Sequence, residues 1–128
     1  MKNLPLIASV LVGVLLIAGA VMLSGQGGAE EPIQNVFMEG DTQVIEITAR
    51  GGYSPRATTA TAGVPTVLRL KTKGTYDCSS ALVIPSLNYR GTLSATAVTE
   101  IPISGEQAQG NLEGLCSMGM YSFTVRFL

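Results

Sequence analysis

Two cysteines and two methionines are the side chains of this sequence best suited to chemistry. Cys116, Met118 and Met120 lie within the short segment Cys116-Ser-Met-Gly-Met120, and the second cysteine is Cys78. Thiolate and thioether sulfurs are soft ligands that select soft metal ions, with Cu(I) foremost among them. At spacings i, i+2 and i+4, the three side chains of the segment would point to one side of an extended backbone. The pattern therefore predicts a Cu(I) site made by these four residues.

Each pair of sulfur residues also has a structural interpretation. A disulfide between Cys78 and Cys116 is the main alternative, because small secreted domains commonly contain one, and it would stabilise by about 2–4 kcal/mol. For Met118 and Met120 the alternative is gap filling in a core, as we expect for Met38. Against it, the intervening glycine indicates a turn before a strand, and Met120 has the opposite parity to the apolar residues that follow. Because a disulfide leaves the methionine pair unexplained, we favour the metal site.

The chain contains no histidine. A blue-copper site needs two imidazoles beside its thiolate, and a structural zinc site needs four cysteine or histidine ligands. Catalytic triads and histidine general bases are excluded for the same reason. We therefore expect a protein that holds and passes on Cu(I), and not an enzyme.

Short runs of β-favouring residues, separated by glycine and proline, must position these sulfurs. They predict strands over Val44–Ala49, Ala57–Ala62, Thr66–Thr72, Ser80–Ile84, Val98–Ile103 and Met120–Phe127. No window after Glu31 has a helical period. The pattern predicts an all-β sandwich over residues 43–128.

The first 24 residues differ from the rest of the chain. Leu4–Leu23 is a nearly continuous apolar run, and as a helix its length would span a bilayer core of about 30 Å. We expect residues 1–24 to be a transmembrane anchor, with a signal peptide cleaved near Ala18-Gly19-Ala20 as the alternative. Residues 25–42, which begin with a Gly-rich stretch, are expected to be a linker.

The charges suggest where the domain resides. Lys2 precedes the apolar run, whereas Glu30 and Glu31 follow it, so the positive-inside bias favours an extracytoplasmic domain at the cell membrane. Without those three residues, the eight basic and nine acidic residues reduce to seven of each sign. Nucleic-acid binding needs a concentrated basic surface. We therefore expect the lipid bilayer as a partner and no nucleic acid.

Five blocks of sequence carry a resemblance to a known family. In chain order they are Gly51-Gly-Tyr-Ser-Pro55, Ala62-Gly-Val-Pro-Thr66, Asp77-Cys-Ser79, Val83-Ile-Pro-Ser-Leu87 and Cys116-Ser-Met-Gly-Met-Tyr121. The chain resembles the cupredoxin-fold Cu(I)-binding domains of the CupA-type membrane-anchored copper chaperones. The resemblance implies a cupredoxin-like β-sandwich, preceded by one transmembrane helix, that binds one or two Cu(I) ions.

The same resemblance implies roles for individual residues. Cys78 and Cys116 would hold the tighter ion, Met118 and Met120 would complete a weaker site, and Glu46 is the candidate carboxylate ligand from the first strand. The implied function is copper buffering, or transfer to a copper-exporting P-type ATPase or another copper transporter. CupA-type domains are thought to act from the cytoplasmic side, whereas the charges here point outward. The alternatives are a cupredoxin-type electron-transfer or oxidase-associated subunit and a disulfide-stapled structural module.

Overall fold

Ten strands and two short 3-10 helices make up residues 34–128, the part of the chain that the computed structural model describes. The elements are β1 (Val36–Glu39), β2 (Thr42–Ala49), β3 (Tyr53–Ser54), β4 (Ala57–Ala60), β5 (Thr66–Thr72), η1 (Cys78–Ser80), β6 (Ala81–Ile84), η2 (Pro85–Leu87), β7 (Tyr89–Thr92), β8 (Ala97–Ile103), β9 (Gly110–Cys116) and β10 (Ser122–Phe127). The predicted all-β sandwich is confirmed.

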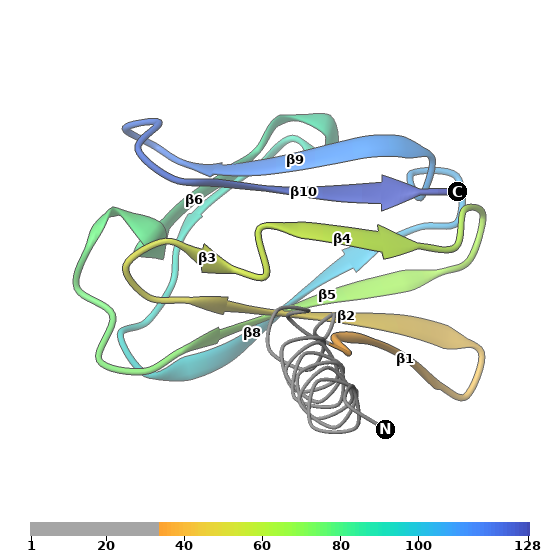
Figure 1. The fold of residues 1–128 in the computed structure, drawn as a ribbon, viewed down its shortest axis with the longest axis horizontal. Helices are drawn as coiled ribbons and strands as arrows, with labels where there is room; N and C mark the ends of the chain where they lie inside the picture. The colour runs from red at the N-terminus through yellow and green to blue at the C-terminus, as the bar shows by residue number, and fades with distance from the viewer. Residues whose placement is uncertain (1–33) are drawn as a thin grey trace, which may run out of the picture. The chain divides into compact units, whose positions relative to one another are not determined.

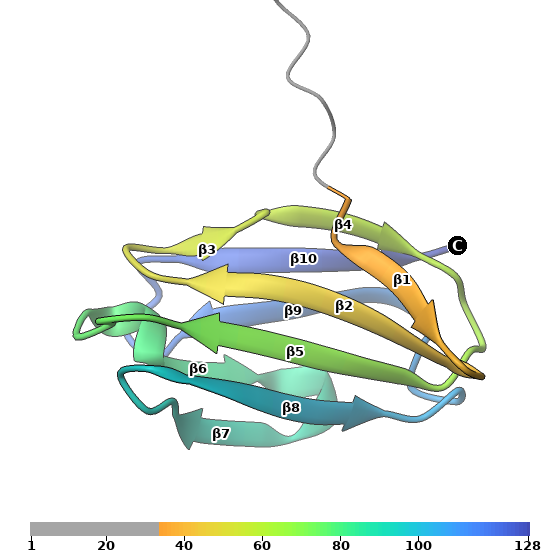
Figure 2. The ribbon, with the colours of Figure 1, turned by 90° about the horizontal axis from the view of Figure 1, so that it is seen from below.

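The strands form two five-stranded sheets. The first has the order β1-β2-β5-β8, with β3 also paired to β2, and the second has the order β4-β10-β9-β6-β7. Both sheets are mixed, because β2 pairs parallel to β5 and β4 pairs parallel to β10. Figures 1 and 2 show the sheets as two layers, and alternate residues of their strands fill the space between them. This core includes Ile45, Ile47, Leu68, Leu70, Leu112, Phe123 and Val125.

Each of the six predicted strands corresponds to an observed one, and four short or irregular strands were missed. β1 lies inside the range 25–42 that was predicted as linker, and three of its four residues are exposed, so it carries no alternating pattern. β9 contains Gly110 and Gly114, which weaken a strand pattern. At Gly114 the missing side chain is required, because a Cβ there would collide with the ring of Phe123.

The predicted anchor or signal peptide, residues 1–24, lies outside the described residues, as does the beginning of the predicted linker. Within residues 34–128, no helix combines the length and the apolar character that crossing a membrane requires.

Candidate metal centre

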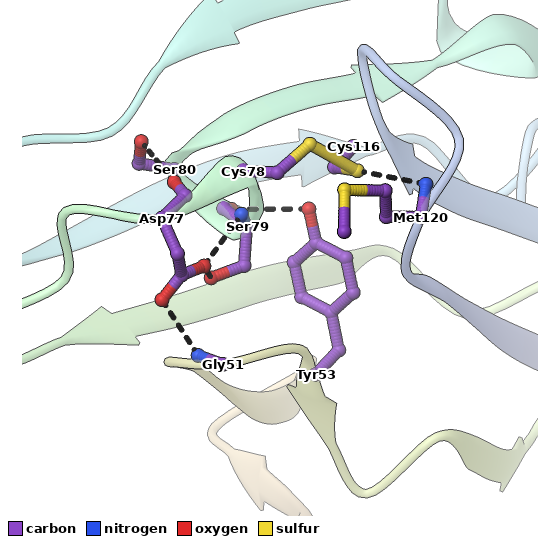
Figure 3. Close-up of a disulfide and its surroundings, with 8 residues drawn as sticks. All are labelled: Gly51, Tyr53, Asp77, Cys78, Ser79, Ser80, Cys116 and Met120. Carbon is purple, nitrogen blue, oxygen red and sulfur yellow. Dashed lines mark hydrogen bonds between the residues drawn. A yellow bond between two sulfur atoms is a disulfide. The ribbon is translucent and has the colours of Figure 1, made fainter.

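Cys78 is held by a capped turn between β5 and β6. It begins η1, and the Asp77 carboxylate before it accepts hydrogen bonds from the Ser79 hydroxyl and, at 2.8 Å, from the Ser79 backbone N–H. The same carboxylate accepts a 2.8 Å bond from the Gly51 N–H, as Figure 3 shows. The bonds from Ser79 and Gly51 lower the pKa of Asp77, which keeps it ionised. Asp77 thus ties the cysteine-bearing turn to the turn between β2 and β3.

Cys116 ends β9, and a tight turn follows it. The Gly119 N–H donates to the Cys116 carbonyl at 2.8 Å, and Gly119 has φ of +73°, a conformation that glycine adopts without strain. The predicted one-sided arrangement of Cys116, Met118 and Met120 is therefore wrong, because it assumed an extended backbone through the segment. Instead the turn returns the chain, so that the Met120 N–H donates to the Cys116 Sγ at 3.2 Å.

The two cysteines meet at this end of the sandwich, and the structure joins them as a disulfide. Their Cα atoms are 5.6 Å apart, Cys116 is fully buried, and Cys78 is half-buried. The disulfide, which the sequence suggested as the main alternative to a metal site, is thus present in the structure (Figure 3). The long-range meeting of the two cysteines, which both the metal site and the disulfide require, is present.

Both methionines of the segment lie on the surface. Met118 is 77% exposed and Met120 is 65% exposed, so neither fills a gap in the core. Met120 belongs to the group of sulfur residues through its backbone bond to Cys116. Met38, expected to be a packing residue, is 55% exposed on β1.

Tyr53 stabilises the turn that carries Cys78. Its ring packs edge-on against Phe123, with the centroids 5.0 Å apart, and its hydroxyl donates to the Ser79 carbonyl at 3.0 Å. Burial, together with the Asp77 charge, raises the pKa of Tyr53 to about 12. The phenol is therefore neutral near pH 7 and positions the Cys78 turn, with no charge of its own to offer a metal ion.

Glu46, the predicted carboxylate ligand, is bonded to other partners. Its neighbours Ile45 and Ile47 are buried, and its own side chain points away from the core, as expected. There it binds Lys71 at 2.7 Å and Arg69 at 3.3 Å, and the Lys71 bond is the main cause of the lowered pKa of Glu46. The structure gives it no contact with either cysteine, because its carboxylate faces outward and Cys116 faces inward.

The chemistry of the donor set fits a soft, monovalent ion once the cysteines are reduced. Reduction of the disulfide would consume two electrons and two protons and release two thiols that share one end of the fold. Two thiolates with neighbouring thioethers suit Cu(I). Within residues 34–128, no group of three or more cysteine, aspartate or glutamate side chains is placed to hold a metal ion. A hard cation such as Ca²⁺ or Mg²⁺, which needs several oxygen ligands, therefore has no such site there.

Sequence reasoning missed two supporting residues, Tyr53 and Asp77. Asp77 was recoverable, because an aspartate two residues before a serine in a turn is typical of a helix cap. Tyr53 carried no such pattern, since its hydroxyl acts across the core on a turn 26 residues away.

Comparison with known proteins agrees with this fold. The family model of the cupredoxin-like domain matches residues 13–125. The metal-binding domain of the Cu(I)-exporting P-type ATPase CopA of Streptococcus pneumoniae D39 is similar in structure, with TM-score 0.66 and 19% identity, covering 78% of this chain and 99% of that domain. A copper-binding protein in its apo form has TM-score 0.66 and 22% identity, covering 74% and 96%.

No curated protein matches this sequence. At such low identities, the two structural likenesses show the fold alone. The family model, in contrast, spans most of the sequence, including both cysteines, Cys78 in η1 and Cys116 in β9. The chain therefore belongs to the family of cupredoxin-like domains.

Proposed function

We propose that this protein is a membrane-tethered Cu(I)-binding protein that buffers copper or passes it to a transporter. One observation carries the proposal. The only two cysteines of the chain, far apart in sequence, meet at one end of the sandwich, where an adjacent turn exposes Met118 and Met120. The lack of histidine makes this a sulfur site, which suits the binding of Cu(I) better than redox cycling of the metal.

The two kinds of sulfur would have different tasks. The reduced thiolates of Cys78 and Cys116 would hold Cu(I) tightly at the buried side of the site. Thioethers bind more weakly and need no deprotonation, so Met118 and Met120 would carry the ion between the thiolates and a partner. Their exposure supports this role, because ligand exchange with another protein requires accessible sulfurs.

The proposed partner is a copper-exporting P-type ATPase or another copper transporter. The fold is shared with the metal-binding domain of the pneumococcal Cu(I)-exporting ATPase, which supports a link to copper export. An anchor over residues 1–24, as in the CupA-type chaperones, would raise the concentration of the domain beside a membrane-embedded acceptor. Extracytoplasmic placement at the cell membrane remains part of this proposal.

The experiment is a competition titration of the reduced chain against a chromophoric Cu(I) chelator under anaerobic conditions. The wild-type protein should withdraw Cu(I) from the chelator, and Cys78→Ser/Cys116→Ser should withdraw almost none. Met38→Leu is the control, because Met38 is an exposed methionine that pairs with Gln43 in the first sheet, whereas Cys116 belongs to the second. Wild-type binding by the double-cysteine variant would refute the proposal, provided that circular dichroism shows it to be folded.

The observed disulfide favours a second candidate, a stapled interaction module without copper. In that case the bond would persist in protein isolated without reductant, and its reduction would cost about 2–4 kcal/mol of stability. Intact-mass analysis after thiol alkylation measures the first property, and thermal unfolding with and without reductant measures the second. A pair of free thiols in freshly isolated protein would exclude this candidate.

A further inference from the structure

A hollow of about 430 Å³ lies beside the sulfur residues, between the β2–β3 turn and the β9–β10 turn. Met120 and Tyr121 line one side of it, and Arg50, Tyr53 and Arg56 line the other. This volume is at the lower end of the range of small-molecule sites, which is roughly 300–1,000 Å³. A peptide-sized ligand would fit, whereas a folded protein could insert only a side chain or a loop.

The hollow carries two arginines that have no acidic partner among the described residues. Arg50 and Arg56 are exposed, and neither forms an ion pair with any residue between 34 and 128. Arg69, on the outer face of the first sheet, shows the contrast, because it binds three carboxylates. Asp77 is the acid beside the hollow, and the Ser79 and Gly51 donors already occupy its oxygens. The free guanidinium groups are suited to bind carboxylates of a ligand in a bidentate manner.

Met120 connects the hollow with the cysteines. Met120 lines the hollow, and its backbone N–H donates to the Cys116 Sγ (Figure 3). One concave surface therefore offers cations for carboxylates and a soft sulfur for copper. Resting on the proposed function, we infer that this hollow receives a small, carboxylate-bearing thiol that delivers Cu(I) to the site.

Once the disulfide between Cys78 and Cys116 has been reduced, the transfer needs no further electrons, because copper remains Cu(I) throughout. The bond between Cu(I) and the sulfur of the small thiol breaks as a bond from Cu(I) to a protein cysteine forms. Each protein thiol that becomes a ligand gives its proton to the departing small thiolate. The arginines hold the carboxylates of the donor during this exchange, so they increase the rate with anionic donors and have no effect on neutral ones.

The test compares two Cu(I) donors, glutathione as the carboxylate-bearing thiol and 2-mercaptoethanol as the neutral one. The full chain, purified in a mild detergent and reduced beforehand, receives Cu(I) from each donor in a stopped-flow experiment at low salt. The variants are Arg50→Gln/Arg56→Gln and the control Arg90→Gln/Arg126→Gln. The control removes the same charge at two exposed arginines that do not line the hollow.

We expect Arg50→Gln/Arg56→Gln to slow transfer from glutathione about tenfold and to leave transfer from 2-mercaptoethanol unchanged. Salt at 1 M should remove the difference, since it shortens the Debye length to about 3 Å. Normal transfer from 2-mercaptoethanol also shows that the variant is folded. The control variant should behave as wild type with both donors.

Three outcomes would overturn the inference. The first is equal rates from glutathione in the wild type and in Arg50→Gln/Arg56→Gln, and the second is an equal slowing by the control variant. The third is a penta-glutamate peptide that binds the wild type but not the variant while glutathione shows no advantage, which would assign the arginines to an acidic protein surface. In all three, copper would still reach the protein. No transfer from either donor would instead refute the proposed function.

Discussion

Two regions of the sandwich differ in whether their exposed side chains have bonding partners. On the outer face of the first sheet, Glu39, Glu46, Glu100, Arg69 and Lys71 form an ion-pair cluster. Every charge in the cluster has a partner within 3.3 Å, and the Arg69 guanidinium also lies 5.9 Å from the Phe37 ring centroid. At the sulfur end, the end of the sandwich that holds Cys78 and Cys116, two methionines are exposed. Two arginines there are also exposed, and neither forms an ion pair with a residue of the range 34–128.

The bonding of the side chains, more than their residue type, distinguishes Glu46 from the two methionines. Glu46 has the chemistry of a metal ligand, yet its bonds to Lys71 and Arg69 occupy it. Met118 and Met120 are of a residue type usual in cores, yet both lie in solvent beside a pair of cysteines. We therefore attribute the ion-paired side chains to stability. We infer a role in binding for the exposed side chains beside the two cysteines.

Among single substitutions outside the cysteines, Gly114→Ala should have a large effect on stability. Its Cβ would meet the buried ring of Phe123, including Cε2 at 2.9 Å, and that ring supports Tyr53 beneath the sulfur end. Overpacking of this kind costs about 1–3 kcal/mol. Thermal unfolding followed by circular dichroism should show a Tm lowered by about 4–8 °C for each kcal/mol.

Gly119→Ala is the matched control for that substitution. No atom lies within 4 Å of a Cβ at Gly119, so the cost there comes only from its left-handed backbone and should be about 1 kcal/mol. A greater loss of stability for Gly119→Ala than for Gly114→Ala would contradict this account of the packing.

Replacing both exposed thioethers should weaken copper binding without weakening the fold. Met118→Leu/Met120→Leu keeps the apolar volume and removes the sulfurs, so we expect Cu(I) affinity to fall about tenfold, or about 1.4 kcal/mol. Competition with a chromophoric chelator measures the affinity, and Met38→Leu should leave it unchanged. If the double-methionine variant retained wild-type affinity, the methionines would have no part in the site.

The smallest effect on stability should come from Glu46→Gln. This variant tests whether Glu46, unlike the cysteines, has a structural role only. The folded-state pKa of Glu46 is lowered from 4.5, chiefly by Lys71, so its charge contributes stability above pH 4.5 that is lost as the pH falls through the lowered value. A partly exposed ion pair contributes about 0–1 kcal/mol. The wild type should therefore be slightly more stable than the variant at pH 7, and the gap should close in acid.

Urea unfolding at several pH values measures this gap. Glu113→Gln is the control, because Glu113 is an exposed strand glutamate that has no ion pair with the described residues. Copper affinity should be unchanged in both variants. A loss of Cu(I) binding in Glu46→Gln alone would restore Glu46 as a ligand.

The sequence predicted the sandwich because its central strands alternate in burial. Thr66–Thr72 matches β5 in full, since Leu68 and Leu70 face the core in strict alternation. β1 was missed because it is an exposed edge strand, held by its pairing with β2. β9 was missed because its glycines weaken the strand pattern. One of them, Gly114, leaves the space that the Phe123 ring occupies.

The sequence indicated the residues of the candidate site but not their geometry. Cys78, Cys116 and the methionine pair stood out by type and spacing. The turn at Gly119, however, reverses the chain, so the parity of an extended strand did not apply between Cys116 and Met120. The support from Tyr53 and the bonds of Glu46 depend on contacts between distant strands, which no local pattern encodes.

The most direct test of the copper account is an anaerobic Cu(I) competition titration of the same chain in its reduced and oxidised states. Cys78 and Cys116 can serve as thiolates only when the disulfide between them is open. The account predicts that the reduced chain withdraws at least one Cu(I) from a strong chelator and that the oxidised chain withdraws none. Equal binding by the two states, or no binding by the reduced chain, would contradict it.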